Sequence, residues 1–158
     1  MIRKLVLVRH GDAEFYGPEG TDESRRLTTR GLEALKSAYP RIFAALRDEP
    51  NVSLWVSPAV RALQTAEVAG EALGIDPDEF ALHDSLYEQD DDEFLAELSA
   101  EGEGIVVAVG HIPFMREMLY QLTGEDLPFK KGAVACIAIT DNDRFHGTLE
   151  WFETAPKR

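Results

Sequence analysis

Two histidines and two arginines occupy places in this sequence where side chains could take part in chemistry. Arg9 and His10 directly follow the apolar run 5–8, Arg61 comes shortly after the expected strand 52–56, and His111 follows the apolar run 105–109. A guanidinium donates paired hydrogen bonds to phosphate oxygens, and a neutral imidazole can attack phosphorus as a nucleophile. The four side chains together would therefore suit the transfer of a phosphoryl group.

Plainer interpretations of the same residues stay open at this point. Arg9 and His10 could be solvated residues where a strand meets a loop, and Arg61 could be an ordinary surface arginine. A zinc site would need three or four converging ligands, and two arginines beside the histidines would repel the metal ion. The acidic run 90–93 lacks the spacing of a calcium-binding loop. We therefore expect neither a metal nor a cofactor.

The apolar runs that precede these residues are typical of strands buried on both faces of a parallel sheet. Such runs cover 5–8 and 105–109, another strand is expected over 52–56, and Gly11 would allow a sharp turn after the first of them. In open α/β sheets, ligands bind beyond the carboxyl ends of the strands. If the three strands are neighbours, the two histidines and the two arginines share one pocket.

Amphipathic spacing predicts helices between these strands. The pattern covers 29–48, where Pro40 predicts a kink or a break, and it returns in 58–73 and 114–123. Ser57 is the expected N-cap of the second of these helices, because a proline follows it at the first helical position. A further short helix is expected to begin in the acidic run.

Shorter strands complete the expected sheet. One is expected over 80–83, and two more over 133–140 and 147–152, joined by a polar turn. Strands that alternate with helices and end in a strand pair predict an α/β protein. We expect one domain over residues 1–158, a three-layer α/β/α sandwich whose mostly parallel sheet includes an antiparallel element. The long polar loop 12–26 is expected to be functional.

The composition limits the possible partners and compartments. A net charge of −13 argues against nucleic acid or an anionic membrane as the main partner. No apolar run is long enough for a signal peptide or a membrane span, so we expect a cytoplasmic protein. The single cysteine, Cys136, lies in an apolar run and is expected to be buried. No pattern around His83 indicates a role for it.

Four motifs, taken together and in order, resemble those of the histidine phosphatase superfamily, whose fold is called phosphoglycerate-mutase-like. One such motif alone would be weak, but the four span nearly the whole chain at suitable separations. They are Leu-Val-Arg-His-Gly at 7–11, Arg-Arg-Leu-Thr-Thr-Arg-Gly at 25–31, Ser-Pro-Ala-Val-Arg-Ala-Leu-Gln-Thr-Ala at 57–66 and Gly-His-Ile-Pro at 110–113.

The resemblance implies a role for each matching residue. His10 would be the nucleophile that becomes phosphorylated, and Arg9 and Arg61 would bind the phosphoryl group. His111 would contact that group and support the transition state. Arg25 matches the arginine of the loop motif and would add a further phosphate contact.

The identity of the general acid stays open. In many members of the superfamily a glutamate after the third strand protonates the leaving group, and Glu88 is the nearest match. Asp12 is the second candidate, because it directly follows Arg-His-Gly. A phosphoramidate leaves easily once its nitrogen is protonated, so a weak or absent acid would matter less for that substrate.

Within the superfamily the chain is similar to the small SixA-type phosphohistidine phosphatases. It is short, it contains Arg-His-Gly-Asp-Ala at 9–13, and it has no room for the insertions that build a lid in larger members. The resemblance implies a metal-independent phosphatase with an open site that acts on phosphohistidine in another protein. A phosphatase of small phosphomonoesters such as sugar phosphates, and a non-catalytic phosphate-binding domain, are the alternatives. The acidic loops 14–24 and 86–92 are expected to set the choice of substrate.

Overall fold

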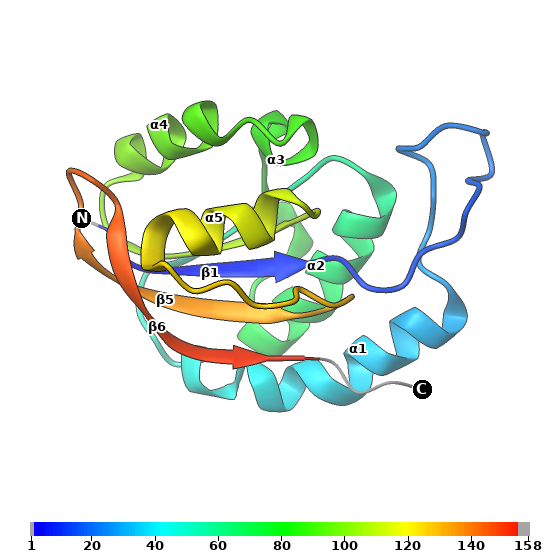
Figure 1. Cartoon of the computed structure of the whole chain (residues 1–158). Helices are drawn as coiled ribbons and strands as arrows, with labels where there is room; N and C mark the ends of the chain where they lie inside the picture. The colour runs from blue at the N-terminus through cyan, green and yellow to red at the C-terminus, as the bar shows by residue number, and fades with distance from the viewer. Residues whose placement is uncertain (1, 155–158) are drawn as a thin grey trace.

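The computed structural model describes residues 2–154 and shows within them one six-stranded sheet with helices on both faces (Figure 1). In chain order the strands are β1 (Ile2–Arg9), β2 (Val52–Val56), β3 (Ala81–Leu82), β4 (Gly104–Gly110), β5 (Val134–Asp141) and β6 (His146–Glu153). Their order across the sheet is β3-β2-β4-β1-β5-β6. The first four neighbours are parallel, whereas β5 and β6 are antiparallel additions. The predicted three-layer α/β/α sandwich is therefore confirmed.

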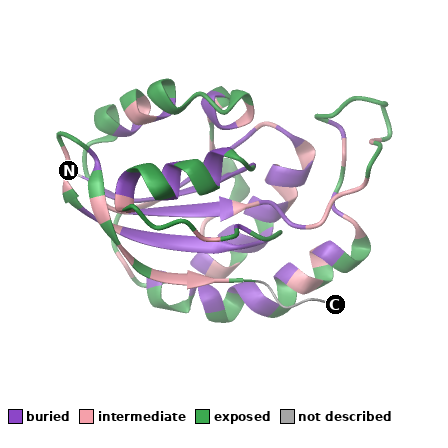
Figure 2. Cartoon of the chain, in the orientation of Figure 1, coloured by how far each residue is buried: buried purple, intermediate pink, exposed green. Residues whose placement is uncertain are grey.

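Among the described residues, two α-helices pack on one face of the sheet and three pack on the other. They are α1 (Thr29–Ile42), α2 (Val60–Leu73), α3 (Asp84–Glu88), α4 (Asp91–Glu101) and α5 (Phe114–Thr123), with 3-10 turns at Ala44–Leu46 and Pro77–Glu79. In Figure 1, α1 lies below the sheet and α3, α4 and α5 lie above it, while α2 packs into the same apolar cluster as α1. Each of the two helical layers packs on its own apolar cluster. The central strands β1, β4 and β5 are mostly buried, whereas the edge strand β6 is intermediate or exposed throughout (Figure 2).

Alternation along β1 explains why its apolar run is continuous. Val6 and Val8 belong to the core beneath α1 and α2, whereas Leu5 and Leu7 belong to the core on the opposite face. Successive side chains of a strand point to opposite faces, so a strand covered on both sides must be apolar at every position. Cys136 on β5 is buried, as predicted.

The helical pattern expected over 29–48 is interrupted, as the prediction of a kink or a break at Pro40 required. The helix α1 passes through Pro40 and ends at Ile42, and a 3-10 turn over Ala44–Leu46 follows it. The prediction of the N-cap of the second helix was wrong. The second helix begins at Val60 with Ala59 as its N-cap, not with Ser57. The Ser57 hydroxyl instead lies 2.8 Å from Nε2 of His111.

No helix in residues 2–154 combines the length and the apolar character that crossing a membrane requires.

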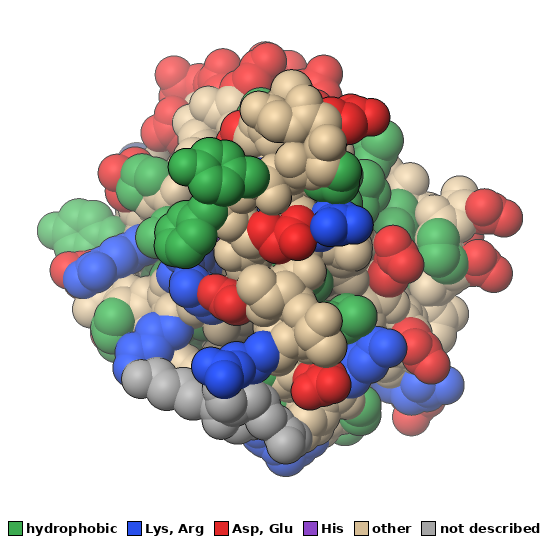
Figure 3. Space-filling model, turned by 90° about the vertical axis from the view of Figure 1, so that its right-hand side faces the viewer, with side chains coloured by type: hydrophobic (Ala, Val, Ile, Leu, Met, Phe, Trp, Pro, Cys, Tyr) green, Lys and Arg blue, Asp and Glu red, His purple; other side chains and the backbone are tan. Residues whose placement is uncertain are grey.

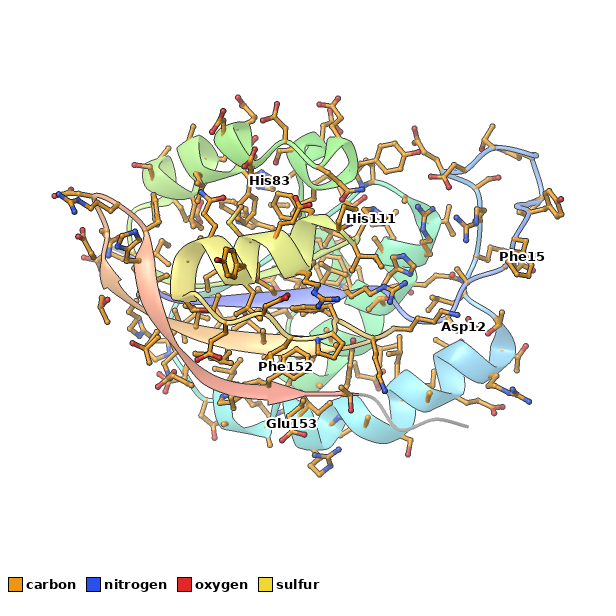
Figure 4. The ribbon with its side chains drawn as sticks, viewed as in Figure 1. Asp12, Phe15, His83, His111, Phe152 and Glu153 are labelled. Carbon is orange, nitrogen blue, oxygen red and sulfur yellow. The ribbon has the colours of Figure 1, made fainter. Side chains whose placement is uncertain are left out.

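His83 directly follows the short strand β3, and its N–H donates to the Val56 carbonyl at 2.9 Å. Its side chain lies apart from His111 (Figure 4). Its ring stacks on Trp55 with 3.9 Å between the ring centroids, and its Nδ1 lies 3.1 Å from Oε1 of Glu97.

Candidate active site

The carboxyl ends of β1, β4 and β2 lie side by side, because these parallel strands are neighbours with β4 in the middle. Backbone pairing continues just beyond the strands. The His10 N–H donates to the Gly110 carbonyl at 3.0 Å, and the Ser57 N–H donates to the Val109 carbonyl at 3.0 Å. The residues that follow all three strands are thereby held at one end of the sheet, on the right in Figure 1.

A cleft of about 700 Å³ opens at this end of the sheet. The space-filling view of this side shows Lys and Arg side chains interspersed with Asp and Glu (Figure 3). The structure brings together all five residues that the sequence assigned to phosphate chemistry, and the cleft is lined by Arg9, His10, Arg25, Arg61 and His111. Asp12 also lines it, whereas Glu88 does not.

His10 is held as one tautomer. Its Nδ1 lies 2.7 Å from the Gly11 carbonyl oxygen, which can only accept, so Nδ1 carries the proton. The lone pair is therefore on Nε2. Burial lowers the pKa of His10 to about 4, against the opposing effect of the Gly11 hydrogen bond and with the help of Arg61, Arg9 and Arg25. The ring is thus neutral at neutral pH and retains a nucleophilic nitrogen.

His111 faces His10 with 5.2 Å between the ring centroids, and Ser57 orients it. The Ser57 Oγ lies 2.8 Å from Nε2 of His111 and accepts the Ala59 N–H at 3.3 Å. If the hydroxyl donates its proton to Nε2 while it accepts from Ala59, the proton of His111 is on Nδ1. Burial is the main cause that lowers the pKa of His111 to about 3, and the His10 and Arg61 charges add to it.

The cleft contains every buried side-chain nitrogen or oxygen that lacks a hydrogen-bond partner among the described residues. They are Nε of Arg9, Nε of Arg61 and Nδ1 of His111. Unpartnered buried polar atoms are rare; the two arginine Nε atoms are donors, and so is Nδ1 of His111 when Ser57 donates to its Nε2. Arg61 also lies in the first turn of α2, where the helix dipole favours an anion. The arrangement suits an anion with several acceptor oxygens, such as a phosphoryl group.

Asp22 is a site residue that the sequence reasoning missed. Its carboxylate accepts from Nη1 of Arg25 at 3.0 Å, from Nη2 of Arg61 at 3.0 Å and from the Tyr87 hydroxyl at 2.8 Å. Burial acts to raise the pKa of Asp22, but the three hydrogen bonds outweigh it and lower the pKa to about 2. Asp22 thereby holds two guanidiniums beside the imidazoles. Its position three residues before Arg25 was the available signal.

The two candidate general acids have different surroundings. Glu88 is exposed at the end of α3 and outside the cleft, while its neighbours Tyr87 and Gln89 line it. Asp12 lines the cleft, but its carboxylate accepts from Nζ of Lys131 at 2.6 Å and from the Thr28 hydroxyl at 2.9 Å. Hydrogen bonding to Lys131 is the largest effect on Asp12 and lowers its pKa, so the carboxylate is ionised at neutral pH.

Each of the three carboxyl groups that line the cleft is ionised at neutral pH. Asp12, Glu14 and Asp22 all have a pKa below the ordinary value, and the cause for Glu14 is chiefly its hydrogen bond with Arg26. No carboxyl group at the cleft is therefore protonated near neutral pH.

Nowhere in residues 2–154 do three or more His, Cys, Asp or Glu side chains form a group that could hold a metal ion.

Comparison with known proteins gives a consistent family and fold. The model of the histidine phosphatase superfamily (branch 1) matches residues 5–94. The protein histidine phosphatase SixA complexed with tungstate is 27% identical, with a TM-score of 0.82 over 96% of this chain and 97% of that chain. SixA from Agrobacterium tumefaciens is 26% identical, with a TM-score of 0.79 over 98% and 99%.

More distant solved structures share the fold alone. A mycobacterial glucosyl-3-phosphoglycerate phosphatase is 16% identical, with a TM-score of 0.66 over 94% of this chain and 97% of that chain. No curated protein sequence matches the chain at a significant level.

Proposed function

The chain belongs to branch 1 of the histidine phosphatase superfamily, and we propose that it is a phosphatase that removes phosphate from phosphohistidine in another protein. The similarity to two SixA structures, at 26% and 27% identity over nearly the full length of both chains, supports this substrate class. The cleft supports the reaction class, because two histidines and three arginines line it together, namely Arg9, His10, Arg25, Arg61 and His111.

The first step of the proposed reaction transfers the phosphoryl group to the protein. Nε2 of His10 attacks phosphorus as the phosphorus–nitrogen bond of the substrate breaks, and the departing imidazole keeps the electron pair and takes a proton from solvent. Arg9, Arg61 and Nδ1–H of His111 donate to the phosphoryl oxygens, and Arg25 adds positive charge. This charge stabilisation is the reason that we propose a reaction without a metal ion.

The second step returns the protein to its starting state. A water molecule attacks the phosphorus of phosphorylated His10, and the phosphorus–Nε2 bond breaks. Orthophosphate leaves, and the lone pair returns to Nε2 while the Gly11 carbonyl keeps the proton on Nδ1. His10 therefore needs no change of tautomer between the two steps.

One observation carries the choice of phosphohistidine over a phosphomonoester. All three carboxyl groups that line the cleft are ionised at neutral pH, so none is ready to protonate a leaving group. An alkoxide needs such a proton, and general acid catalysis typically contributes about 10²–10⁴-fold. The imidazole of phosphohistidine can instead be protonated from water on its other ring nitrogen.

The proposal is tested by the rates of phosphate release from a phosphohistidine protein and from a panel of sugar phosphates, measured with EDTA present. We expect the wild type to prefer the phosphohistidine protein, with the activity lost in His10→Ala. A preference for one sugar phosphate would assign the protein to small-molecule metabolism instead. Tight orthophosphate binding with no hydrolysis of any substrate would make it a binding domain, and loss of activity in EDTA would overturn metal independence.

A further inference from the structure

Exposed apolar side chains gather at the mouth of the cleft. Phe15 and Tyr16 are the most exposed large hydrophobic residues among those the structure describes, at 89% and 86%. Phe15 lines the cleft together with Ile112, which is 39% exposed. We call these three residues the aromatic rim. Contiguous apolar surface in contact with water is unfavourable and marks a place where another molecule binds.

The loop that carries the two aromatic residues is anchored on both sides of them. On one side, the Glu14 N–H donates to the Arg26 carbonyl at 2.8 Å, and Nε of Arg25 donates to the Glu14 carbonyl at 2.6 Å. On the other side, Gly17 lies so close to the Ser24 backbone that a Cβ would clash with it. The rings are therefore displayed by fixed backbone, which reduces the entropy lost when a partner binds.

The rim is apolar in character although charged residues surround it. Arg26 is paired with Glu14 at 3.1 Å, and Lys131 is paired with Asp12 at 2.6 Å. In these pairs Glu14, which precedes Phe15, and Asp12, which lines the cleft with Phe15, each have a cationic partner. Phe15 also lies farther from the sheet than His111 and Asp12 (Figure 4). A substrate must extend well beyond its phosphoryl group to cover the rim.

We propose that the aromatic rim is the docking surface for the protein that carries the phosphohistidine substrate. The inference rests on the proposed function and adds to it the chemistry of the partner's surface. Apolar side chains beside the phosphohistidine bind Phe15, Tyr16 and Ile112, while the phosphoryl group reaches the arginines and imidazoles inside the cleft. Aromatic side chains that become buried when a partner binds commonly carry a large share of protein–protein affinity.

The test compares kcat/KM for phosphohistidine proteins of several different folds with kcat/KM for free phosphohistidine, which has the same bond but no protein surface. The variant is Phe15→Ala/Tyr16→Ala. Its matched control is Tyr120→Ala, because Tyr120 is a 60% exposed aromatic residue on α5 that does not line the cleft. For the best protein substrate, we expect the ratio of the two kcat/KM values to fall at least about tenfold in the double variant. The control should match the wild type.

Two results would overturn the inference, and they differ in what else they overturn. If the wild type is active on a phosphohistidine protein but the ratio stays within about twofold in the double variant, or falls equally in Tyr120→Ala, the rim is not the docking surface. The proposed function would then still stand. If the wild type hydrolyses free phosphohistidine but no phosphohistidine protein, both the protein substrate and the rim are overturned.

Discussion

Replacing Ser57 by alanine tests how His111 is oriented in the cleft. Ser57 is fully buried, its hydroxyl lies 2.8 Å from Nε2 of His111, and it accepts the Ala59 N–H. In Ser57→Ala the Nε2 atom loses its partner, and nothing then fixes the proton of His111 on Nδ1. The donor that the proposed reaction requires at a phosphoryl oxygen is therefore only partly present.

The expected loss of rate follows from the hydrogen bond between Nδ1 of His111 and a charged phosphoryl oxygen, which the proposed reaction requires and which Ser57→Ala weakens. A hydrogen bond to a charged group contributes about 1.5–3 kcal/mol, which corresponds to roughly 10–100-fold in kcat/KM. The free energy of unfolding should also fall, by about 1–3 kcal/mol, because a buried nitrogen is left unpaired. The two losses have one cause, so they should appear together in the Ser57 variant.

The assay measures kcat/KM for phosphoramidate and the free energy of unfolding in urea. Ser53→Ala is the matched control, because Ser53 lies on β2, the strand that Ser57 directly follows, and its 3.4 Å hydrogen bond to Glu101 is outside the cleft. The control should retain kcat/KM within about twofold. If Ser57→Ala loses stability but also retains kcat/KM within about twofold, the tautomer argument for His111 is refuted.

Three further predictions concern the titratable groups in and beside the cleft. His10 and His111 have lowered pKa values, about 4 and about 3, so NMR should find both rings neutral at pH 6, and titration near 6.5 would contradict burial as the cause. Because the Asp22 pKa is depressed from 3.8 to about 2 but its carboxylate is half exposed, Asp22→Asn should cost only about 1 kcal/mol of unfolding free energy. That difference should be full above about pH 4 and vanish as Asp22 is protonated towards pH 2; a constant difference would refute the ionic origin. Glu88→Gln should keep kcat/KM within about twofold, and a tenfold loss would restore Glu88 as the general acid.

The strands and their end residues could be predicted from the sequence because their determinants are local. A strand covered on both faces has an unbroken apolar run, and the residue that follows the run lies where the strand leaves the covered sheet. Arg9, His10 and His111 were located in this way, and Arg61 from its place in the first turn of the following helix. Only the adjacency of the three strands had to be assumed, and the sheet order confirms it.

The features that were missed depend on geometry that no local pattern encodes. Asp22 reaches Arg61 only because the loop between β1 and α1 folds back over the cleft. Whether Tyr87 or Glu88 faces the cleft is decided by how the short helix α3 is rotated against its neighbours. Ser57 was interpreted as a helix cap because caps and buried hydrogen-bond partners use the same residue types.

The central claim is that His10 accepts the phosphoryl group, and trapping the intermediate tests it most directly. The protein is mixed with a labelled phosphohistidine substrate, quenched in alkali during turnover and digested for mass spectrometry. We predict a label on His10 that is stable in alkali and labile in acid, and absent in His10→Ala. A label on another residue, or full activity in His10→Ala, would contradict the account.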